Sequence, residues 1–291
     1  MSEFTKKIFD GQQTTPDEWV AYLKEAHKEA PGMTPDSFDN FKNAEGMNSY
    51  QVLTNLLVLL PRKLNVLDLA CGDANLSTYM DRLPNKELNI LGVDMSVHEL
   101  ALAEKRTFKS RFRIKNEMAG KISEPDGSFD AILCHMAFML MNPIEPVANE
   151  IYRLLKPGGI FAAVVGSIPN SIDPLSIFRK TFRAFVTEKF PKYAPPITGD
   201  SRVYNDEKIH EIFPTGQFEQ VHLQRFMTSA EITLDQYWPT YKDYYFVSAL
   251  PEKEKEELKN RLEAEAKKSL NKHGKITVES AQTMIFCKRS V

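Results

Sequence analysis

Short β-type runs alternate with helical patterns between residues 64 and 166, and this alternation limits the possible folds more than any other feature of the 291-residue chain. Parallel neighbouring strands need a connection of a dozen or more residues, usually a helix, whereas antiparallel strands can be joined by a two-residue turn. The alternation therefore predicts right-handed βαβ units and a parallel sheet with helices on both faces. The strands are expected at 64–70, 88–93, 111–115, 129–134 and 160–166, and the helices at about 74–83, 96–106 and 143–155.

The flanking segments predict additions to this sheet. Residues 1–60 have helical patterns, and one helix starts at Thr15-Pro16, where Glu18 completes a capping box. A proline-rich stretch and a long helical region interrupt the second half of the chain. We therefore predict a helical cap at 1–60 and a sheet domain at 61–291, with a lid insertion at about 167–204 and a helical insertion at about 234–273, between strands at 218–228 and 275–288.

The charge and the cysteine content argue against several classes of partner. The chain has 37 basic and 39 acidic residues, so its net charge of -2 gives no reason to expect nucleic acid or an anionic membrane as partner. Its three cysteines are widely spaced and form no CxxC pair, so neither a disulfide framework nor a metal site is expected. The N-terminal residues have no apolar core, and the longest apolar run, 52–60, is too short to span a bilayer. We expect a cytoplasmic protein, and the sequence does not indicate its oligomeric state.

The stretch "LNVLDLACGDANLSTYM", at 64–80, places a carboxylate at the tip of the first strand and a turn of small residues after it. Ligands of open α/β sheets bind at the carboxyl ends of the strands. The dinucleotide fingerprint GxGxxG needs three glycines, but its positions here hold Ala70, Gly72 and Asn75. Asp68 would also repel a pyrophosphate. A nicotinamide-dependent dehydrogenase is therefore disfavoured.

A cationic ligand would suit this turn better. S-adenosylmethionine has a sulfonium and an α-ammonium group and no phosphate, so Asp68 could accept hydrogen bonds from the ammonium. A turn of small residues lets the backbone approach the ligand closely. Asp94 follows Gly72 by 22 residues, which is the usual position of an acid that binds the two ribose hydroxyls.

Four motifs occur in an order that resembles the class I S-adenosylmethionine-dependent methyltransferases, in the small-molecule branch that includes the ubiquinone/menaquinone-type enzymes. They are "VLDLACGDANLS", "LGVDMS", "DGSFDAILC" and "IYRLLKPGGIFAAVV", and they cover about residues 64 to 166. The resemblance implies a Rossmann-like, doubly wound, seven-stranded α/β sheet whose last strand is antiparallel. It also implies methyl transfer from S-adenosylmethionine to an O, N or C atom of a small molecule by in-line displacement, which releases S-adenosylhomocysteine.

The resemblance also assigns cofactor-binding roles by position. The turn after the first strand would surround the methionine part, Asp94 would bind the ribose and Met95 would pack on adenine. Relatives hold the adenine amino group after the third strand, where this chain reads "KNEMAGKIS" and offers Glu117 and Met118. Cys134 and His135 match residues that face the methyl donor. The implied cofactor-binding set is Asp68, Ala70, Cys71, Gly72, Asp94, Met95, Glu117, Met118 and Cys134.

Catalytic and acceptor-binding residues follow less directly. His135 could be a general base, with an ordinary pKa of about 6.5, or it could only shape the pocket. A pair of histidines common in relatives after the fourth strand reads Met139-Leu140 here, which puts any role of that pair in doubt. The candidates for the acceptor pocket are Tyr50, Phe178, Phe182 and Tyr241, and ordinary helix packing would explain these aromatic residues equally well.

Two other readings of the same fold stay open. DNA and RNA amino-methyltransferases carry an Asn/Asp-Pro-Pro-aromatic tetrapeptide after the fourth strand, where this chain reads "CHMAFM", so a macromolecular substrate is disfavoured. A cofactor-binding protein without methyl transfer, either regulatory or cyclase-like, would retain the same acids. The sequence does not identify the acceptor, its methylated atom or the pathway.

Overall fold

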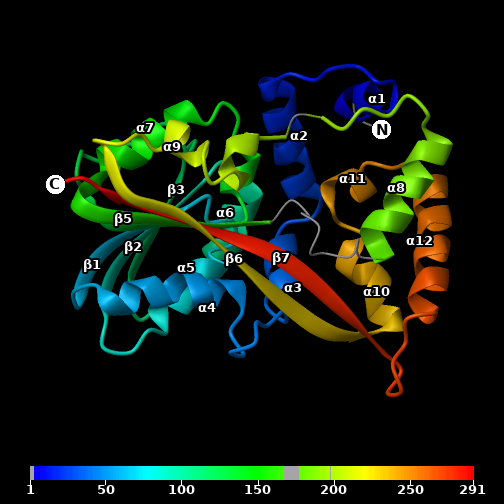
Figure 1. The fold of residues 1–291 in the computed structure, drawn as a ribbon. Coiled ribbons are helices and arrows are strands. Elements are labelled where there is room, and N and C mark those ends of the chain that lie inside the picture. Colours follow the sequence, from blue (N-terminus) through cyan, green and yellow to red (C-terminus); the bar gives the residue numbers. More distant parts are fainter. Residues whose placement is uncertain (1–2, 167–176, 197) are drawn as a thin grey trace. The chain divides into compact units, whose positions relative to one another are not determined.

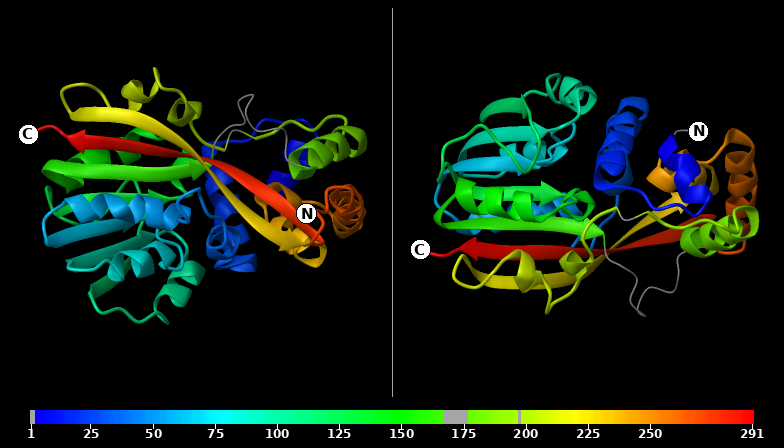
Figure 2. Two further views of the ribbon diagram at one scale, coloured as in Figure 1. Left: turned by 60° about the horizontal axis from the view of Figure 1, so that its bottom comes forward. Right: turned by 90° about the horizontal axis from the view of Figure 1, so that it is seen from above.

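Seven strands form one sheet in the order β3-β2-β1-β4-β5-β7-β6, in a computed structural model that describes residues 3–166, 177–196 and 198–291 (Figure 1). The strands are β1 (Lys63–Leu69), β2 (Glu87–Asp94), β3 (Arg111–Asn116), β4 (Phe129–His135), β5 (Leu155–Gly166), β6 (Phe218–Thr233) and β7 (Lys275–Arg289). The pairs from β3 to β5 are parallel, and β7 is antiparallel to β5. The predicted fold class is confirmed, and Figure 2 shows β6 and β7 as long neighbouring strands at one side of the sheet.

The strand order reverses beside β1. The chain proceeds outward from β1 through β2 to β3, and then returns to place β4 on the other side of β1. Ligands of doubly wound sheets bind in the crevice at such a switch point, outside the carboxyl ends of the strands. The turns that follow β1, β2 and β4 are therefore the ones to examine for a site.

The chain divides into two compact units. The first comprises Met1–Phe41, Pro169–Ile197 and Ser229–Ser280, and the second comprises Lys42–Ile168, Thr198–Thr228 and Ala281–Val291. Residues 42–60 thus belong to the second unit, together with β1 to β5. The expected division into a helical cap, a lid insertion and a helical insertion stays a prediction.

In the second unit, helices cover both faces of the sheet (Figure 1). The apolar side of α7 packs on one face with alternate residues of β1, such as Leu67 and Leu69. Successive side chains of a strand point to opposite faces, so Asp68 faces the other side, where its partner Ser77 lies on α5. The helical elements here are α4 (Ser49–Thr54), η1 (Asn55–Leu59), α5 (Asn75–Asp81), α6 (Val97–Ala103), η2 (Phe138–Leu140), α7 (Glu145–Leu154), η3 (Ser201–Tyr204) and α9 (Ile209–Ile212).

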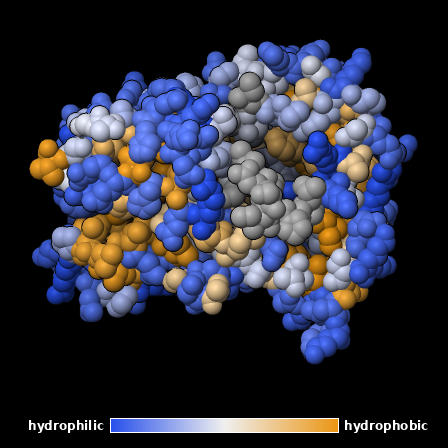
Figure 3. Space-filling model, viewed as in Figure 1, coloured by the Kyte–Doolittle hydropathy of each residue, from blue (hydrophilic) through white to orange (hydrophobic). Residues whose placement is uncertain are grey.

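The first unit is mainly helical. Its helices are α1 (Glu3–Phe9), α2 (Pro16–Glu29), α3 (Met33–Phe38), α8 (Ile177–Lys189), α10 (Leu234–Tyr241), α11 (Tyr245–Ser248) and α12 (Glu252–Lys267). The capping box of Thr15 and Glu18 is present at the start of α2. The helical region expected near 234–273 contains three helices, since Pro251 precedes α12 and cannot continue a helix from α11. Figure 3 shows mainly hydrophilic side chains on α12 at the right-hand edge, while its buried side carries Leu258, Leu262 and Ala266.

Gly199 gives a direct test of the packing in the second unit. A Cβ atom at Gly199 would lie 1.9 Å from the backbone oxygen of Met139 in η2, so only glycine fits there. We expect Gly199→Ala to lower the free energy of unfolding by about 1–3 kcal/mol, because the backbone must move apart. Gly166→Ala is the matched control, since its Cβ would make an ordinary 3.6 Å contact with Met136. Urea unfolding followed by circular dichroism measures both, and equal stabilities of the two variants would contradict this packing.

Candidate functional site

The turn after β1 has a strained backbone. Ala70, Gly72 and Ala74 have φ angles of +55°, +52° and +63°, in the left-handed region that favours glycine. Placing a residue with a Cβ atom there costs of the order of 1 kcal/mol, and such conformations persist where the surroundings impose them. The N–H of Cys71 donates to the carbonyl of Val93, at 3.0 Å, and so holds the turn against β2. The small residues at 70–74 therefore form a tight turn, as the sequence predicted.

Asp94 connects this turn with the next one. It ends β2, and its Oδ2 atom accepts the backbone N–H of Gly72 at 2.9 Å. Its Oδ1 atom accepts the backbone N–H of Ser96 at 2.8 Å, just before α6 begins. These two bonds fix the orientation of the carboxylate between the turns that follow β1 and β2. The arrangement suits a group that must present two oxygens to a pair of hydroxyls.

Asp68 is a buried carboxyl group beside this turn. Its residue is only 1% exposed, and the hydroxyl of Ser77 donates to its Oδ2 atom at 2.6 Å. Burial raises the pKa of Asp68 to about 7, although the hydrogen bonds from Ser77 act in the opposite direction. A cation placed beside Asp68 would favour its ionised form, so the group suits a positively charged ligand.

The two cysteines of the predicted site are buried thiols. Burial raises the pKa of Cys71 and of Cys134 well above the ordinary value, which keeps both neutral. A Cβ atom at Gly92 would lie 2.9 Å from the Cys71 sulfur, so Cys71 packs closely on β2. Cys134 belongs to the core on the α7 face of the sheet. Contact of either cysteine with a cofactor stays a prediction.

His135 ends β4 in a buried aromatic stack. Its Nε2 atom is 2.8 Å from the hydroxyl oxygen of Ser49, and its ring lies flat on that of Tyr50 at a centroid distance of 3.7 Å. Tyr50 also stacks on Tyr79, at 5.2 Å. Burial lowers the pKa of His135 to about 3, far below the neutral range in which a general base is effective. The geometry thus favours the pocket-shaping role of His135 over the base role.

Two of the residues predicted to contact adenine, Met95 and Glu117, lie beside Asp94. Met95 follows it directly and is half-buried. The backbone N–H of Glu117 donates to the Asp94 carbonyl at 3.2 Å, which brings the end of β3 to the same place. The carboxylate of Glu117 accepts the backbone N–H of Ser123 at 2.9 Å and also the Ser123 hydroxyl. Met118 is 45% exposed.

The remaining acceptor candidates belong to the first unit. Phe178 stacks on Tyr241 at a centroid distance of 4.2 Å and on Phe182 at 5.7 Å. Phe178 and Tyr241 are buried, so these contacts hold α8 against α10. Tyr50 lies in the second unit with Asp68 and Asp94. The packing therefore explains this aromatic group within its own unit, and its role in binding an acceptor stays a prediction.

Several polar residues around the turn were missed from the sequence. Asp73 is buried, forms an ion pair with Arg106 and accepts the backbone N–H of Asn75 at 3.2 Å. Glu99 is buried, and its Oε2 atom is 3.6 Å from the place that a Cβ atom of Gly72 would occupy. The only signal for Glu99 was its position as third residue after Ser96, which indicated a helix cap and not a site.

Comparisons with known proteins agree with this geometry. Residues 67–163 match the model of a family described as a methyltransferase domain. The demethylmenaquinone methyltransferase of Listeria monocytogenes serotype 4a (strain HCC23) is 29% identical over 143 residues, which are 48% of this chain and 60% of the relative. The chain thus spans less than two thirds of the length of that curated relative.

Solved structures share the fold. Phosphoethanolamine N-methyltransferase 2 of Haemonchus contortus has a TM-score of 0.52 at 16% identity, over 100% of this chain and 61% of that one. The [4+2]-cyclase SpnF has a TM-score of 0.50 at 15% identity, over 94% of this chain and 93% of that one. The fold is therefore that of the class I methyltransferases. For residues 67–163, the resemblance to that family is confirmed at the level of the domain.

The raised pKa of Asp68 predicts how the stability of the protein depends on pH. The folded protein holds the Asp68 proton up to about pH 7, whereas the unfolded chain releases it near 3.8. The folded state binds more protons between these values, so its stability falls as the pH rises through this window. Asp68→Asn removes this contribution and keeps an acceptor for Ser77, so its stability relative to the wild type should increase steadily from pH 4 to 7.

Urea unfolding at several pH values measures this difference. His135 makes the stability rise with pH, which is opposite to the effect of Asp68. Because its pKa is lowered to about 3 in the folded protein, the unfolded chain binds more protons between about pH 3 and pH 6.5. That slope is common to variant and wild type and cancels when they are compared. A constant difference between Asp68→Asn and wild type would mean that Asp68 is ionised throughout.

Proposed function

We propose that this protein transfers a methyl group from S-adenosylmethionine to an O, N or C atom of a small-molecule acceptor by in-line displacement and releases S-adenosylhomocysteine. One observation carries the proposal: the carboxyl groups of Asp68 and Asp94 stand at the ends of neighbouring strands around a tight turn. The family match over residues 67–163 supports it.

Each part of this site has a role in the proposed reaction. Bound S-adenosylmethionine supplies an electrophilic methyl group on its sulfonium. Asp68 would bind the ammonium group, and Asp94 would hold the two ribose hydroxyls. The turn at 70–72 would let the backbone lie against the ligand. His135, neutral and stacked on Tyr50, would shape the wall of the pocket, so that alignment and exclusion of water supply the rate enhancement.

A ring-bearing acceptor of the quinol type is the first candidate, because the curated relatives are named demethylmenaquinone methyltransferases. Tyr50, in the same unit as Asp68 and Asp94, is the residue proposed to contact it. A nucleic-acid substrate is not proposed, since the charge of the chain is nearly balanced. In the described residues, no helix has the length and apolar character needed to cross a bilayer. The cytoplasmic location expected from the sequence stays a prediction.

A protein that binds the cofactor without methyl transfer remains the second candidate. The same fold occurs in a [4+2]-cyclase, so the fold does not distinguish the two functions. Turnover does distinguish them. Release of S-adenosylhomocysteine together with a mass increase of one methyl group in a demethylmenaquinol analogue would identify a methyltransferase, and binding without either product would favour the second candidate.

Calorimetric titration with S-adenosylhomocysteine tests the cofactor site directly. We expect micromolar binding by the wild type and a loss of about 1–3 kcal/mol in Asp94→Ala, because a hydrogen-bonded charged group is removed. Asp206→Asn, at an exposed ion pair with Arg225, is the control and should bind like the wild type. If neither S-adenosylhomocysteine nor S-adenosylmethionine binds and NADH does, the proposal fails in favour of a dehydrogenase.

The raised pKa of Asp68 adds a prediction about protons. Binding of the ammonium group requires the ionised carboxylate, so near pH 6 the protein should release a proton from Asp68 when S-adenosylmethionine binds, and the affinity should increase up to about pH 7. Titrations in buffers of different ionisation enthalpy measure this release. Asp68→Asn should lose it and bind more weakly. Equal release by variant and wild type would assign the proton to another group.

A further inference from the structure

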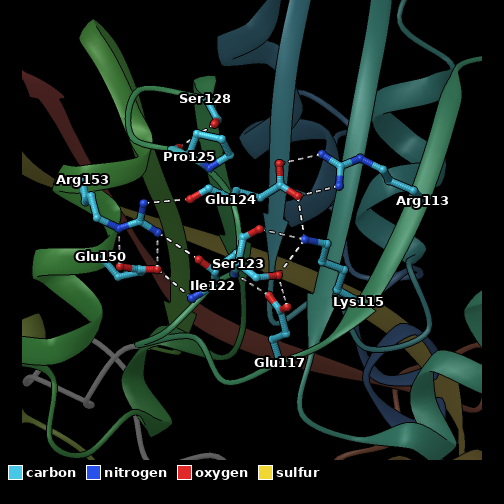
Figure 4. A network of polar contacts seen from close by, with 10 residues as sticks. All are labelled: Arg113, Lys115, Glu117, Ile122, Ser123, Glu124, Pro125, Ser128, Glu150 and Arg153. Atoms are coloured by element: carbon cyan, nitrogen blue, oxygen red, sulfur yellow. Dashed lines mark hydrogen bonds and ion pairs between the residues drawn. The ribbon is translucent and has the colours of Figure 1, made fainter.

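The segment from Glu117 to Glu124, which leaves β3, is held from two sides by ionic side chains (Figure 4). We call residues 117–124 the β3–β4 segment. On one side it meets Glu150 and Arg153 of α7, and on the other it meets side chains of β3. The mechanism proposed above uses none of these holding residues.

The contact with α7 takes both backbone groups of one buried residue. Ile122 is 3% exposed, and its N–H donates to Oε1 of Glu150 at 2.6 Å. Its carbonyl accepts from Nη2 of Arg153 at 2.9 Å. Glu150 and Arg153 are one helical turn apart and bind each other at 2.7 and 2.9 Å. They thus act as a paired donor and acceptor for the Ile122 backbone.

Arg153 is suited to this task by its shape. The Nε atom of Arg153 donates to the carboxylate of Glu150. Its Nη2 atom donates to the same carboxylate and to the Ile122 carbonyl. Its Nη1 atom donates to the Glu124 carbonyl and to the Asp126 carboxylate. Each of the five N–H groups of the guanidinium thus has an acceptor. Lysine has three donors around one nitrogen and cannot reproduce this planar pattern.

The contact with β3 holds the far end of the segment. Arg113 binds both carboxylate oxygens of Glu124, at 2.6 and 2.9 Å, and Lys115 binds the same carboxylate at 2.7 Å. The hydrogen bond from Arg113 is the main cause that lowers the pKa of Glu124 to about 2. Lys115 also donates to Ser123, which in turn donates to Glu117. The two ends of the segment are therefore hydrogen-bonded to each other, and side chains of β3 hold the end at Ser123 and Glu124.

The segment begins beside the proposed ribose site. The N–H of Glu117 and the side-chain amide of Asn116 both donate to the Asp94 carbonyl, at 3.2 and 2.9 Å. β2 lies between β1 and β3 in the sheet. A ligand with its ammonium at Asp68 on β1 and its ribose at Asp94 on β2 extends its base toward the end of β3. The base then lies against the start of the β3–β4 segment.

We propose that Glu150 and Arg153 are positioning residues which, by holding the backbone of Ile122, fix the β3–β4 segment where the nucleobase lies and so set the selectivity for the base. The inference rests on the proposed function, because it needs a nucleoside at Asp94. Neither residue touches the ligand. A residue that only stabilised the fold would not affect the choice between two bases.

The test compares two ligands that differ only in the base. S-adenosylhomocysteine carries a 6-amino group on its purine, and S-inosylhomocysteine carries a 6-oxo group. Calorimetry gives both Kd values, and their ratio is the selectivity. We expect the wild type to prefer S-adenosylhomocysteine and Arg153→Lys to reduce the ratio by about two- to tenfold. Glu150→Gln keeps an oxygen for the Ile122 N–H, so its reduction should be smaller.

Arg225→Lys is the matched control, because it makes the same substitution at an exposed ion pair with Asp206 in the same unit. It should leave the ratio unchanged. If Arg153→Lys does not fold, Glu150→Gln still tests the proposal. The proposal then requires that the ratio of Kd values fall in Glu150→Gln by more than it does in the control Arg225→Lys.

Three outcomes would overturn the proposal. An unchanged ratio of Kd values in Arg153→Lys, whether or not both ligands bind more weakly, would show that Glu150 and Arg153 only stabilise the fold. Equal affinity of the wild type for both ligands would show that the base is not selected, while the proposed function stands. Failure of the wild type to bind either ligand would overturn the proposed function itself, and this inference with it.

Discussion

Asp94 is the residue on which the geometry of the candidate site depends. Its carboxylate binds the backbone of the turn after β1 and of the turn after β2, and its carbonyl accepts from the end of β3. Three parallel strands therefore end at fixed positions relative to one residue. A ligand that lies across them meets groups that are already ordered, which lowers the conformational entropy lost on binding.

Several residues around Asp94 adopt backbone conformations or environments that are unfavourable for their residue type. Ala70 and Ala74 have left-handed backbone angles, and Asp68 is a carboxyl group in a buried position. Such departures are expected where a protein binds or reacts, because the surrounding structure must hold them against their own preferences. The central strands β1, β2, β4 and β5 are mainly buried, and apolar side chains of the sheet pack against those of α7.

Local patterns account for what could be predicted from the sequence. Strands, capping boxes and the spacing between Asp68 and Asp94 are all short-range features, and the structure has the predicted sheet. Within residues 1–60, which were expected to be helical, α4 ends at Thr54 and the chain continues as a 3-10 helix to Leu59. The environment of His135 could not be predicted, because Ser49 and Tyr50 approach it only through the fold. Its pKa depends on that burial, and so the choice between a base and a wall residue needed the structure.

The ion pairs that hold the β3–β4 segment have a consequence for association between copies of the chain. β3 is the outermost strand of the sheet on its side, and an edge strand offers unpaired backbone groups to another molecule. Arg113 and Lys115 place two cations on this strand, with Glu124 beside them. A strand from a second molecule could add there only by removing water from these charges, which is costly. This side of the sheet is thereby protected against edge-to-edge aggregation.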